Sequence, residues 1–481
     1  MSFVLDKTMN PAKVFIERKT KVVERWDPHH YRPEFSRLAS QIRAINSRKL
    51  QNIVKLSSEQ WDQKSHFGEE FPYVEISNID LFLGRLNAPK VIPTSEAPSR
   101  AKMLVRPGDL LVSLTRPTRG AICFVCNDVP LAVASNGLAI IRSIDRSSIL
   151  PGFLYHILRS SICISQFDQH SSGGNYPAIT EDSFLRLLIP LPSITEQENF
   201  SDQLDAYYCK AEANLSQASS LLASIDDVLL DELGITCQPE PANTLESRIF
   251  KSRFVALTGR RLDPLYHQAD IFAFARDVKY GLQRLGDKVD YFISGFPAGR
   301  NDQGGEEDGG IIQVRPTNIS EDRELVFKRN VYIATLDMKT CKADILMRGE
   351  VLFNNTNSQE QVGKTAWFDL DGNYFSSNHI TRIGTKSGEL APQYLTYILN
   401  LYQRKKVFFK LCTNWNNQSG VGSDILWRIP IPLPKFTRQT EIVMRLETVR
   451  AKARALRDQA RADLEKAKRD IENLILGKEA G

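Results

Sequence analysis

The amino-acid sequence predicts an α+β (mixed α/β) protein in which one module of about 240 residues is used twice. Three observations support this fold class. Short motifs recur at a nearly constant offset, each copy contains short apolar segments typical of strands, and each copy closes on a long helical pattern. The chain has 481 residues, which is too many for one ordinary core. We therefore expect globular segments at residues 1–192 and 236–435, followed by long helices at 193–235 and 436–478.

The repeat rests on five motif pairs whose offsets drift only from 236 to 242. Any one pair could be a coincidence, but five pairs in the same order are not. The pairs are Arg25-Trp26-Asp27-Pro28 with Arg261-Leu262-Asp263-Pro264, Ser77-Asn78-Ile79 with Thr317-Asn318-Ile319, Gly108-Asp109-Leu110-Leu111 with Gly349-Glu350-Val351-Leu352, Ser135-Asn136 with Ser377-Asn378, and Ile189-Pro190-Leu191-Pro192 with Ile431-Pro432-Leu433-Pro434.

Each globular segment mixes strand and helix patterns. Residues 110–115, 121–126 and 138–143 are short, apolar and partly β-branched, with Gly, Pro, Asn or Asp around them, so we expect strands. Residues 153–161 and their counterpart 394–402 have the pattern of short helices. Gly-rich and Asn-rich loops follow these helices at 171–175 and 414–420.

A long helix follows each Ile-Pro-Leu-Pro motif, starting near Thr195 or Thr437 and ending at Gly234 or Gly477. Apolar residues in the first helix alternate in steps of four and three from Leu204 to Leu229, which is a heptad seam. The second helix keeps this pattern with one additional step of four at Leu464. Each helix should be roughly 60 Å long.

The two helices differ in charge. Residues 193–235 contain 1 basic and 9 acidic residues, whereas residues 436–478 contain 11 basic and 7 acidic residues. Opposite charges favour pairing of the two helices with each other, and the path of the chain requires them to run in opposite directions. We expect an intramolecular, antiparallel coiled coil. The alternative is two surface helices, each packed on its own globular segment.

These features together resemble the specificity (S) subunit of type I restriction–modification systems. The resemblance rests on the duplicated Arg-x-Asp-Pro motif, the Ile-Pro-Leu-Pro motif with the Thr, Glu and Gln residues up to Gln197, and the duplicated heptad helix. It implies that 1–192 and 236–435 are target recognition domains that bind double-stranded DNA, and that the helices are conserved spacers. It also implies a complex with two methyltransferase (M) subunits, and with motor/endonuclease (R) subunits for restriction. The second copy has Arg438 where the first has Glu196, so a role shared by that glutamate is in doubt.

Catalytic motifs are absent from the sequence. It contains no GxGxxG after a strand, no phosphate-binding GxxxxGK[ST] loop and no HExxH. The pair Cys123 and Cys126 lacks a second pair of zinc ligands, and His29-His30 is not repeated in the second copy. We therefore expect a non-catalytic subunit without metal or cofactor, in a complex that methylates DNA. With no apolar stretch long enough to cross a membrane, we expect it in the cytoplasm.

The candidate DNA contacts fall into two sets. Residues that both copies share are candidates for scaffold or phosphate contacts, with turn formation as the alternative: Asn78, Asn318, Asn136 and Asn378. Residues that differ on polar loops are candidates for base contacts, since Arg can bind guanine and Asn or Gln can bind adenine in the major groove. These are Arg116, Thr118, Arg119, Asn175 and Tyr176 in the first copy, and Asn355, Asn357, Gln359, Gln361, Trp415, Asn416, Asn417 and Gln418 in the second. A plain solvated loop is the alternative for each of them.

Because the loops differ, we expect two different half-sites, hence an asymmetric bipartite target whose unread gap depends on the helices. Two other functions compete with this hypothesis. One is a self-contained nuclease with a divergent site, for which Glu306-Glu307-Asp308 is the dense acidic cluster. The other is a coiled-coil assembly scaffold without a DNA role.

Overall fold

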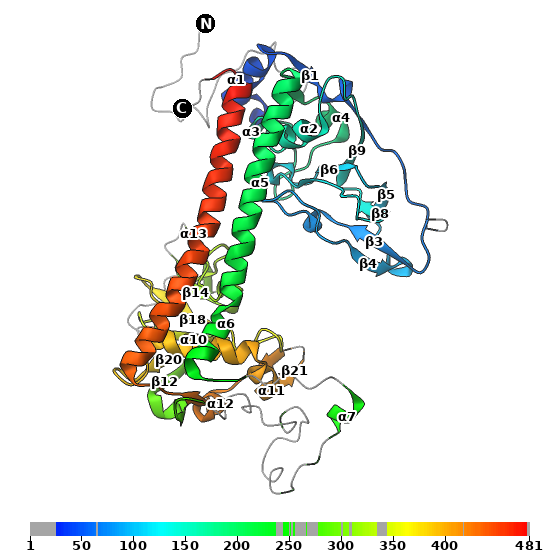
Figure 1. The fold of residues 1–481 in the computed structure, drawn as a ribbon. Coiled ribbons are helices and arrows are strands. Elements are labelled where there is room, and N and C mark those ends of the chain that lie inside the picture. Colours follow the sequence, from blue (N-terminus) through cyan, green and yellow to red (C-terminus); the bar gives the residue numbers. More distant parts are fainter. Residues whose placement is uncertain are drawn as a thin grey trace. The chain divides into compact units, whose positions relative to one another are not determined.

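The computed structural model divides the chain into two compact units (Figure 1). The first comprises Met1–Ser216 and Leu456–Gly481, and the second comprises Gln217–Ala455. The structure describes residues 26–63, 66–236, 244–249, 251, 254, 266, 278–299, 302–306, 310–333, 344–416 and 418–478. Arg25, the second Arg-x-Asp-Pro motif (261–264), Glu307, Asp308 and Asn417 lie outside these residues.

The first unit contains two four-stranded sheets and one two-stranded sheet. One sheet has the antiparallel order β2 (Val54–Leu56), β9 (Leu138–Ile144), β6 (Leu110–Ser113), β7 (Ile122–Phe124). The other has the order β4 (Lys90–Pro93), β3 (Glu70–Val74), β8 (Ala132–Ser135), β5 (Ala101–Val105), with β3 and β8 parallel. The short sheet pairs β1 (Ser47–Lys49) with β10 (Leu188–Pro190), so the Ile-Pro-Leu-Pro motif ends a strand.

The second unit repeats this plan. The order β12 (Val289–Ser294), β20 (Ile380–Thr385), β16 (Val351–Asn354), β18 (Thr365–Trp367) matches β2-β9-β6-β7. A second sheet has the order β13 (Gln303–Gly304), β15 (Tyr332–Ile333), β14 (Ile311–Val314), β19 (Tyr374–Ser376), and its β14–β19 pair is parallel like β3–β8. β11 (Leu282–Arg284) pairs with β23 (Pro430–Pro432) as β1 does with β10. A three-stranded sheet adds β17 (Thr356–Asn357), β22 (Gln418–Gly420) and β21 (Thr413–Trp415).

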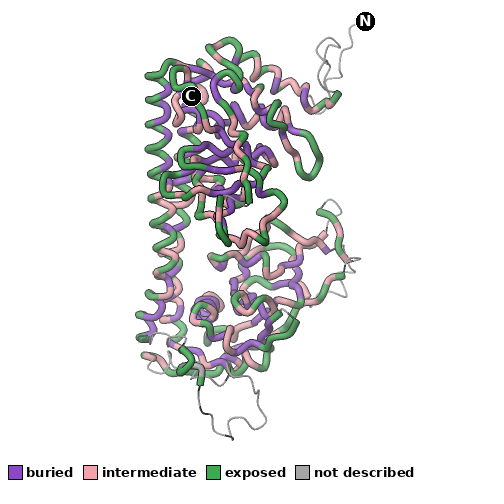
Figure 2. Tube along the Cα trace, turned by 90° about the vertical axis from the view of Figure 1, so that its right-hand side faces the viewer, coloured by how far each residue is buried: buried purple, intermediate pink, exposed green. Residues whose placement is uncertain are grey.

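Short helices pack on the sheets at matching places. In the first unit they are α1 (Pro33–Arg43), α2 (Pro151–Leu158), α3 (Ser161–His170) and α4 (Glu181–Leu185). In the second they are α10 (Pro392–Arg404), α11 (Val407–Leu411) and α12 (Ser423–Arg428), and a further short helix, α7 (Leu245–Arg248), has Leu245 exposed. α10 covers the predicted helical pattern at 394–402, and α2 covers 153–158 of the predicted 153–161, where a break separates it from α3. Buried residues concentrate on the strands and on the inward faces of the helices (Figure 2).

The long helices α5 (Ile194–Ala223) and α13 (Phe436–Ile475) each contribute to both units, and α6 (Ile225–Leu233) continues α5 in the second unit. In the first unit Lys210 Nζ lies 2.7 Å from Asp463 Oδ2, and Lys468 lies 5.5 Å from the centre of the Tyr208 ring. Residue numbers rise along α5 as they fall along α13, so the segments pair antiparallel there. The helix expected at 193–235 is interrupted at Ser224, whose hydroxyl donates to the Leu221 carbonyl in competition with the helix backbone.

The cores explain which residues the helices bury. Leu204 of α5 belongs to the same hydrophobic core as Ala467, Ile471 and Ile475 of α13 and the strands of the first unit. Leu229 and Leu233 of α6 belong to the core of the second unit, together with Ile442 and Leu446 of α13. Within each unit, the heptad seam therefore merges with the globular core. No helix among the described residues is long and apolar enough to span a bilayer.

Candidate nucleic-acid interface

The candidate interface region of each unit contains an ion pair that occurs in both copies of the repeat, fully buried in the second unit and partly buried in the first. Asp109 and Glu350 stand directly after Gly108 and Gly349, which have positive φ angles of 85° and 99° that favour glycine. Arg142 Nη2 lies 2.7 Å from Asp109 Oδ2, and Arg382 Nη2 lies 2.7 Å from Glu350 Oε1. Each arginine also donates to a carbonyl of the neighbouring sheet, Leu104 or Ile345. This contact, here called the shared ion pair, holds the two main sheets of each unit together.

Glu59 extends the shared ion pair in the first unit. Its carboxylate accepts hydrogen bonds from Arg106 and Arg142, and these bonds lower its pKa from 4.5 to about 2 against the opposing effect of burial. The hydrogen bond to Glu59 raises the pKa of Arg106, and the hydrogen bond to Asp109, followed by that to Glu59, raises the pKa of Arg142. The Glu59 carboxylate thus stays charged at neutral pH as part of the scaffold.

Asn78 and Asn318 occupy equivalent tight turns. Each side-chain oxygen accepts from the backbone N–H three residues earlier, of Glu75 or Arg315, at 2.8 and 2.9 Å. Asn318 also donates to the Val326 carbonyl and is almost fully buried. Within the chain, both asparagines therefore stabilise turns, which is the alternative role that the sequence offered for them.

In the first unit, the loop after β6 meets a hairpin that follows α3. We call residues 172–178, and the equivalent residues 413–420 of the second unit, the polar hairpin. In the first unit, the hairpin is held by β-bridges from Ala178 to Ser172 and to Thr115. Arg116 has a left-handed backbone with φ of 50°, and its guanidinium lies 4.2 Å from the centre of the Tyr176 ring and donates to the Asn175 carbonyl at 3.2 Å. Tyr176 is 71% exposed, so this cation–π pair lies at the surface.

Other predicted residues of the first unit lie around the same place. Thr118 and Arg119 are exposed on a single 3-10 turn, Pro117–Arg119, that follows Arg116. A cavity of about 440 Å³ lies beside them, and its lining includes Arg116, Arg119 and Tyr176. Asn136 is exposed, and its backbone N–H donates to the Arg100 carbonyl.

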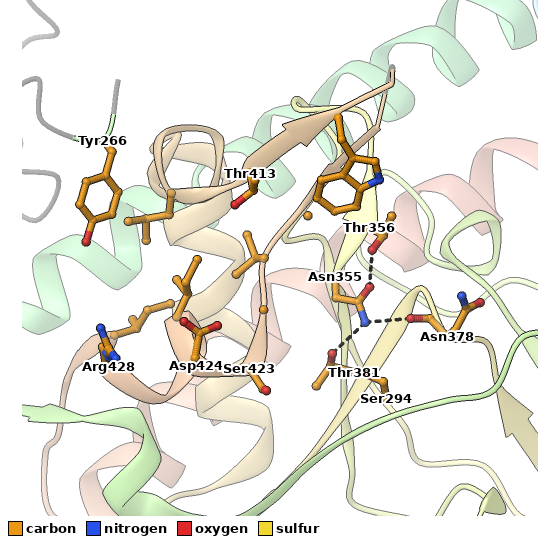
Figure 3. Close-up of a pocket in the computed structure, with 17 residues that line it drawn as sticks. Tyr266, Ser294, Asn355, Thr356, Asn378, Thr381, Thr413, Ser423, Asp424 and Arg428 are labelled. Atoms are coloured by element: carbon orange, nitrogen blue, oxygen red, sulfur yellow. Dashed lines mark hydrogen bonds between the residues drawn. The ribbon is translucent and has the colours of Figure 1, made fainter. Parts of the chain in front are cut away.

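In the second unit, the polar hairpin forms a small sheet with β17. Thr356 pairs with Gly420 as Thr115 pairs with Ala178 in the first unit, so the two hairpins occupy equivalent positions. Trp415 is 46% exposed, and Asn416 and Gln418 beside it are also exposed. A cavity of about 870 Å³ lies against this hairpin, with Trp415, Asn355 and Asn378 in its lining (Figure 3).

The four amides predicted on the loop after β16 differ in exposure. Asn355 is buried and donates to the Asn378 carbonyl and to the Thr381 hydroxyl, as Figure 3 shows. Gln359 donates to the Phe409 carbonyl, while Asn357 accepts from the Ser358 N–H. Gln361 is half-buried, and its carbonyl accepts from the Asn354 side chain. Only part of this loop therefore presents amides to solvent.

Sequence reasoning missed several residues at these sites. Tyr266, Asp424 and Arg428 also line the cavity of the second unit, and their places in the sequence gave no signal. Gln197 and Gln439 also stand at equivalent positions of the repeat, and this equivalence is the signal that could have indicated them as structural residues. Among the residues that the structure describes, no His, Cys, Asp and Glu side chains are grouped so as to hold a metal ion.

Comparisons with known proteins agree with the resemblance noted from the motifs. Residues 306–466 match the family model for the type I restriction modification DNA specificity domain. The match contains β16, β20 and the polar hairpin of the second unit. The class that this domain defines is the specificity subunit of type I restriction–modification systems, and the resemblance noted from the motifs is confirmed.

Particular relatives agree with this class. A type I restriction enzyme specificity subunit of Methanocaldococcus jannaschii is 24% identical over 162 residues, 34% of this chain and 37% of the relative. The HindI specificity subunit of Haemophilus influenzae is 28% identical over 172 residues, 35% of this chain and 34% of the relative. The matches thus span about a third of the length of these relatives. A chain from a solved structure of a type I restriction–modification system is 21% identical, covers 90% of this chain and 96% of its own length, and has a TM-score of 0.48.

Proposed function

We propose that the chain is the non-catalytic subunit that selects the DNA sequence for a type I restriction–modification complex. One observation carries the proposal most strongly. The two units place different exposed side chains, Arg116 with Tyr176 and Trp415 with Gln418, at equivalent positions on an equivalent scaffold. Two domains that share a scaffold but differ in the side chains at their polar hairpins are suited to recognise two different half-sites.

The target would therefore be bipartite and asymmetric, and the helices α5 and α13 would determine the unread gap between its halves. The complex would contain two methyltransferase subunits docked on the helices, with motor/endonuclease subunits added for restriction. Such a complex acts on chromosomal and incoming DNA, so we place it in the cytoplasm.

Base contacts are proposed for the exposed residues at the tips. Arg116 is braced by Tyr176, which reduces the conformational entropy that it loses on binding a guanine edge. Arg119, Thr118 and Asn175 lie beside it in the first unit. In the second unit the corresponding set is Trp415, Asn416, Asn417 and Gln418, with Asn357, Gln359 and Gln361 on the adjoining loop. Asn136 and Asn378 are proposed phosphate contacts, whereas Asn78, Asn318 and Asn355 support the backbone around them.

The experiment begins with the wild-type chain bound to its methyltransferase partner. Selection from random duplexes should return one bipartite sequence with a fixed gap. Arg119→Ala should then weaken binding by about 1–3 kcal/mol and relax the preference at one position of one half-site.

Arg146→Ala is a suitable control, because Arg146 is an exposed arginine of the same unit that follows β9. A uniform loss across sequences with a smaller salt dependence would assign Arg119 to a phosphate instead. Failure of the wild-type complex to select any sequence would refute the proposed function itself.

A further inference from the structure

Each unit contains one glutamine of the long helix that is completely buried. Gln197 lies in the first turn of α5 and Gln439 in the first turn of α13, and both have an exposed fraction of 0%. Amide side chains are rarely buried to this degree, because an unsatisfied polar atom in the interior costs free energy. Two occurrences at equivalent positions point to a role in both units.

Both glutamines make the same three hydrogen bonds. Gln197 Oε1 accepts from the Leu150 N–H at 2.9 Å, and its Nε2 donates to the carbonyls of Ser148 and Pro192 at 3.1 and 2.9 Å. Gln439 Oε1 accepts from the Ala391 N–H at 2.8 Å, and its Nε2 donates to the carbonyls of Glu389 and Pro434 at 2.8 and 3.0 Å. Every partner is a backbone group, so the contact does not depend on which side chains the recognition domain carries.

The three partners belong to different elements of the recognition domain. Leu150 and Ala391 are the N-cap residues of α2 and α10, for which no side-chain cap is present. Ser148 and Glu389 lie in the loop before these helices, and Pro192 and Pro434 follow the strands β10 and β23. One amide therefore connects the start of the long helix to a helix, a loop and a strand end of the globular domain.

The residue before each glutamine makes different contacts in the two units. Glu196 accepts from the Ser193 N–H in an exposed cap, whereas its counterpart Arg438 bonds to Glu441 and Glu232. The two copies have thus diverged next to the glutamine, while the glutamine contact is the same in both. The glutamine contact is therefore independent of how each helix start is capped.

We propose that Gln197 and Gln439 are positioning residues that fix each recognition domain on the long helix that follows it, and that selectivity for the length of the target gap depends on them. The inference rests on the proposed function, because only a bipartite target has a gap. A domain that can rock on its helix would still read its own half-site. Because its position relative to the helix would vary, it would also bind half-sites separated by an incorrect gap.

The test uses the full chain in complex with its methyltransferase partner. The probe is a set of duplexes carrying the two selected half-sites with the wild-type gap, or with gaps one and two base pairs longer or shorter. Gln197→Leu and Gln439→Leu should each lower the ratio of affinities for correct and incorrect gaps by about fivefold or more, because three buried hydrogen bonds are lost. The base preference within each half-site should remain as in the wild type.

Gln203→Leu is the matched control, because Gln203 is exposed on the helix that carries Gln197 and donates to the Asn199 side chain. Should a Leu variant fail to fold, Gln→Met at the same position keeps the length without burying a charge, and should show the same loss of gap selectivity. Mere destabilisation lowers the active fraction equally for all gaps. An unchanged ratio in folded variants would overturn the inference while leaving the proposed function intact, and a wild-type complex without any gap preference would refute both.

Discussion

Arg382 is among the largest fully buried side chains of the described structure, and its charge is balanced by a carboxylate that is equally buried. Removing one member of such a pair leaves an uncompensated charge in the interior, which costs far more than losing an exposed pair. The fold of the second unit should therefore be sensitive to a single substitution in the shared ion pair.

Arg382→Met should destabilise the second unit by about 3–5 kcal/mol, because Glu350 would remain buried without its partner. Urea unfolding measures this loss. Arg348→Met is the control, since its partner Asp371 is 89% exposed and the change should stay within about 0.5 kcal/mol. Equal effects of the two substitutions would show that the buried pair is not a structural element.

Acid should weaken the first unit through Glu59. Its pKa is lowered in the folded chain, so its contribution to stability is complete above about pH 4.5 and is lost as the pH falls toward about 2. The difference in free energy of unfolding between wild type and Glu59→Gln should therefore be largest above pH 4.5 and should shrink toward pH 2. A difference that is constant over this range would contradict the assignment of the low pKa.

Composition predicted loops at 171–175 and 414–420, but the second segment forms the strands β21 and β22. Composition also failed to predict the environments of the amides. Asn355 was expected on a polar loop as a candidate base contact, but it directly follows the buried strand β16 and bonds inward. Composition cannot reveal this, because the partners Asn378 and Thr381 are contributed by a different part of the chain.

At the scale of elements, the charge contrast between the helices has a local cause in the second unit. Glu232 near the end of α6 is buried and pairs with both Arg438 and Arg445 of α13. The repeat places Leu474 where Glu232 stands and Glu196 where Arg438 stands. The departure at Arg438 is therefore explained by the helix end that packs against it in its own unit.

A double-mutant cycle measures this pairing. Glu232→Gln and Arg438→Gln should each destabilise the second unit, and their combined effect should be smaller than the sum by about 0.5–3 kcal/mol. Strict additivity in thermal or urea unfolding would mean that the two side chains do not stabilise each other.

Element boundaries were predictable where periodicity was strong. The long helices, the short helices at 153–161 and 394–402 and the main strands follow from pattern. The order of the sheets does not, since β1 and β10 pair across about 140 residues of chain and periodicity carries no information on partners.

At the scale of the whole molecule, the proposed function links helix length to target geometry. Deleting one heptad from each helix, residues 212–218 and 456–462, keeps the apolar seam in phase and removes roughly 10 Å of helix. The gap in the selected target should shorten by about three base pairs, given roughly 3.4 Å per base pair. Selection from random duplexes reports the gap, and an unchanged gap with intact half-sites would separate helix length from spacing.

Arg142 and Arg382 hold their sheets through contacts to acids and carbonyls of the scaffold, and none of these contacts involves the polar hairpin. The shared ion pair would therefore remain in place if the exposed residues of the hairpin were exchanged. For protein engineering, the exposed residues of the polar hairpins at 172–178 and 413–420 are the positions to vary, while the sheets beneath them stay unchanged. Libraries confined to them and to the adjoining loops could yield new DNA specificities from this chain without redesign of its core.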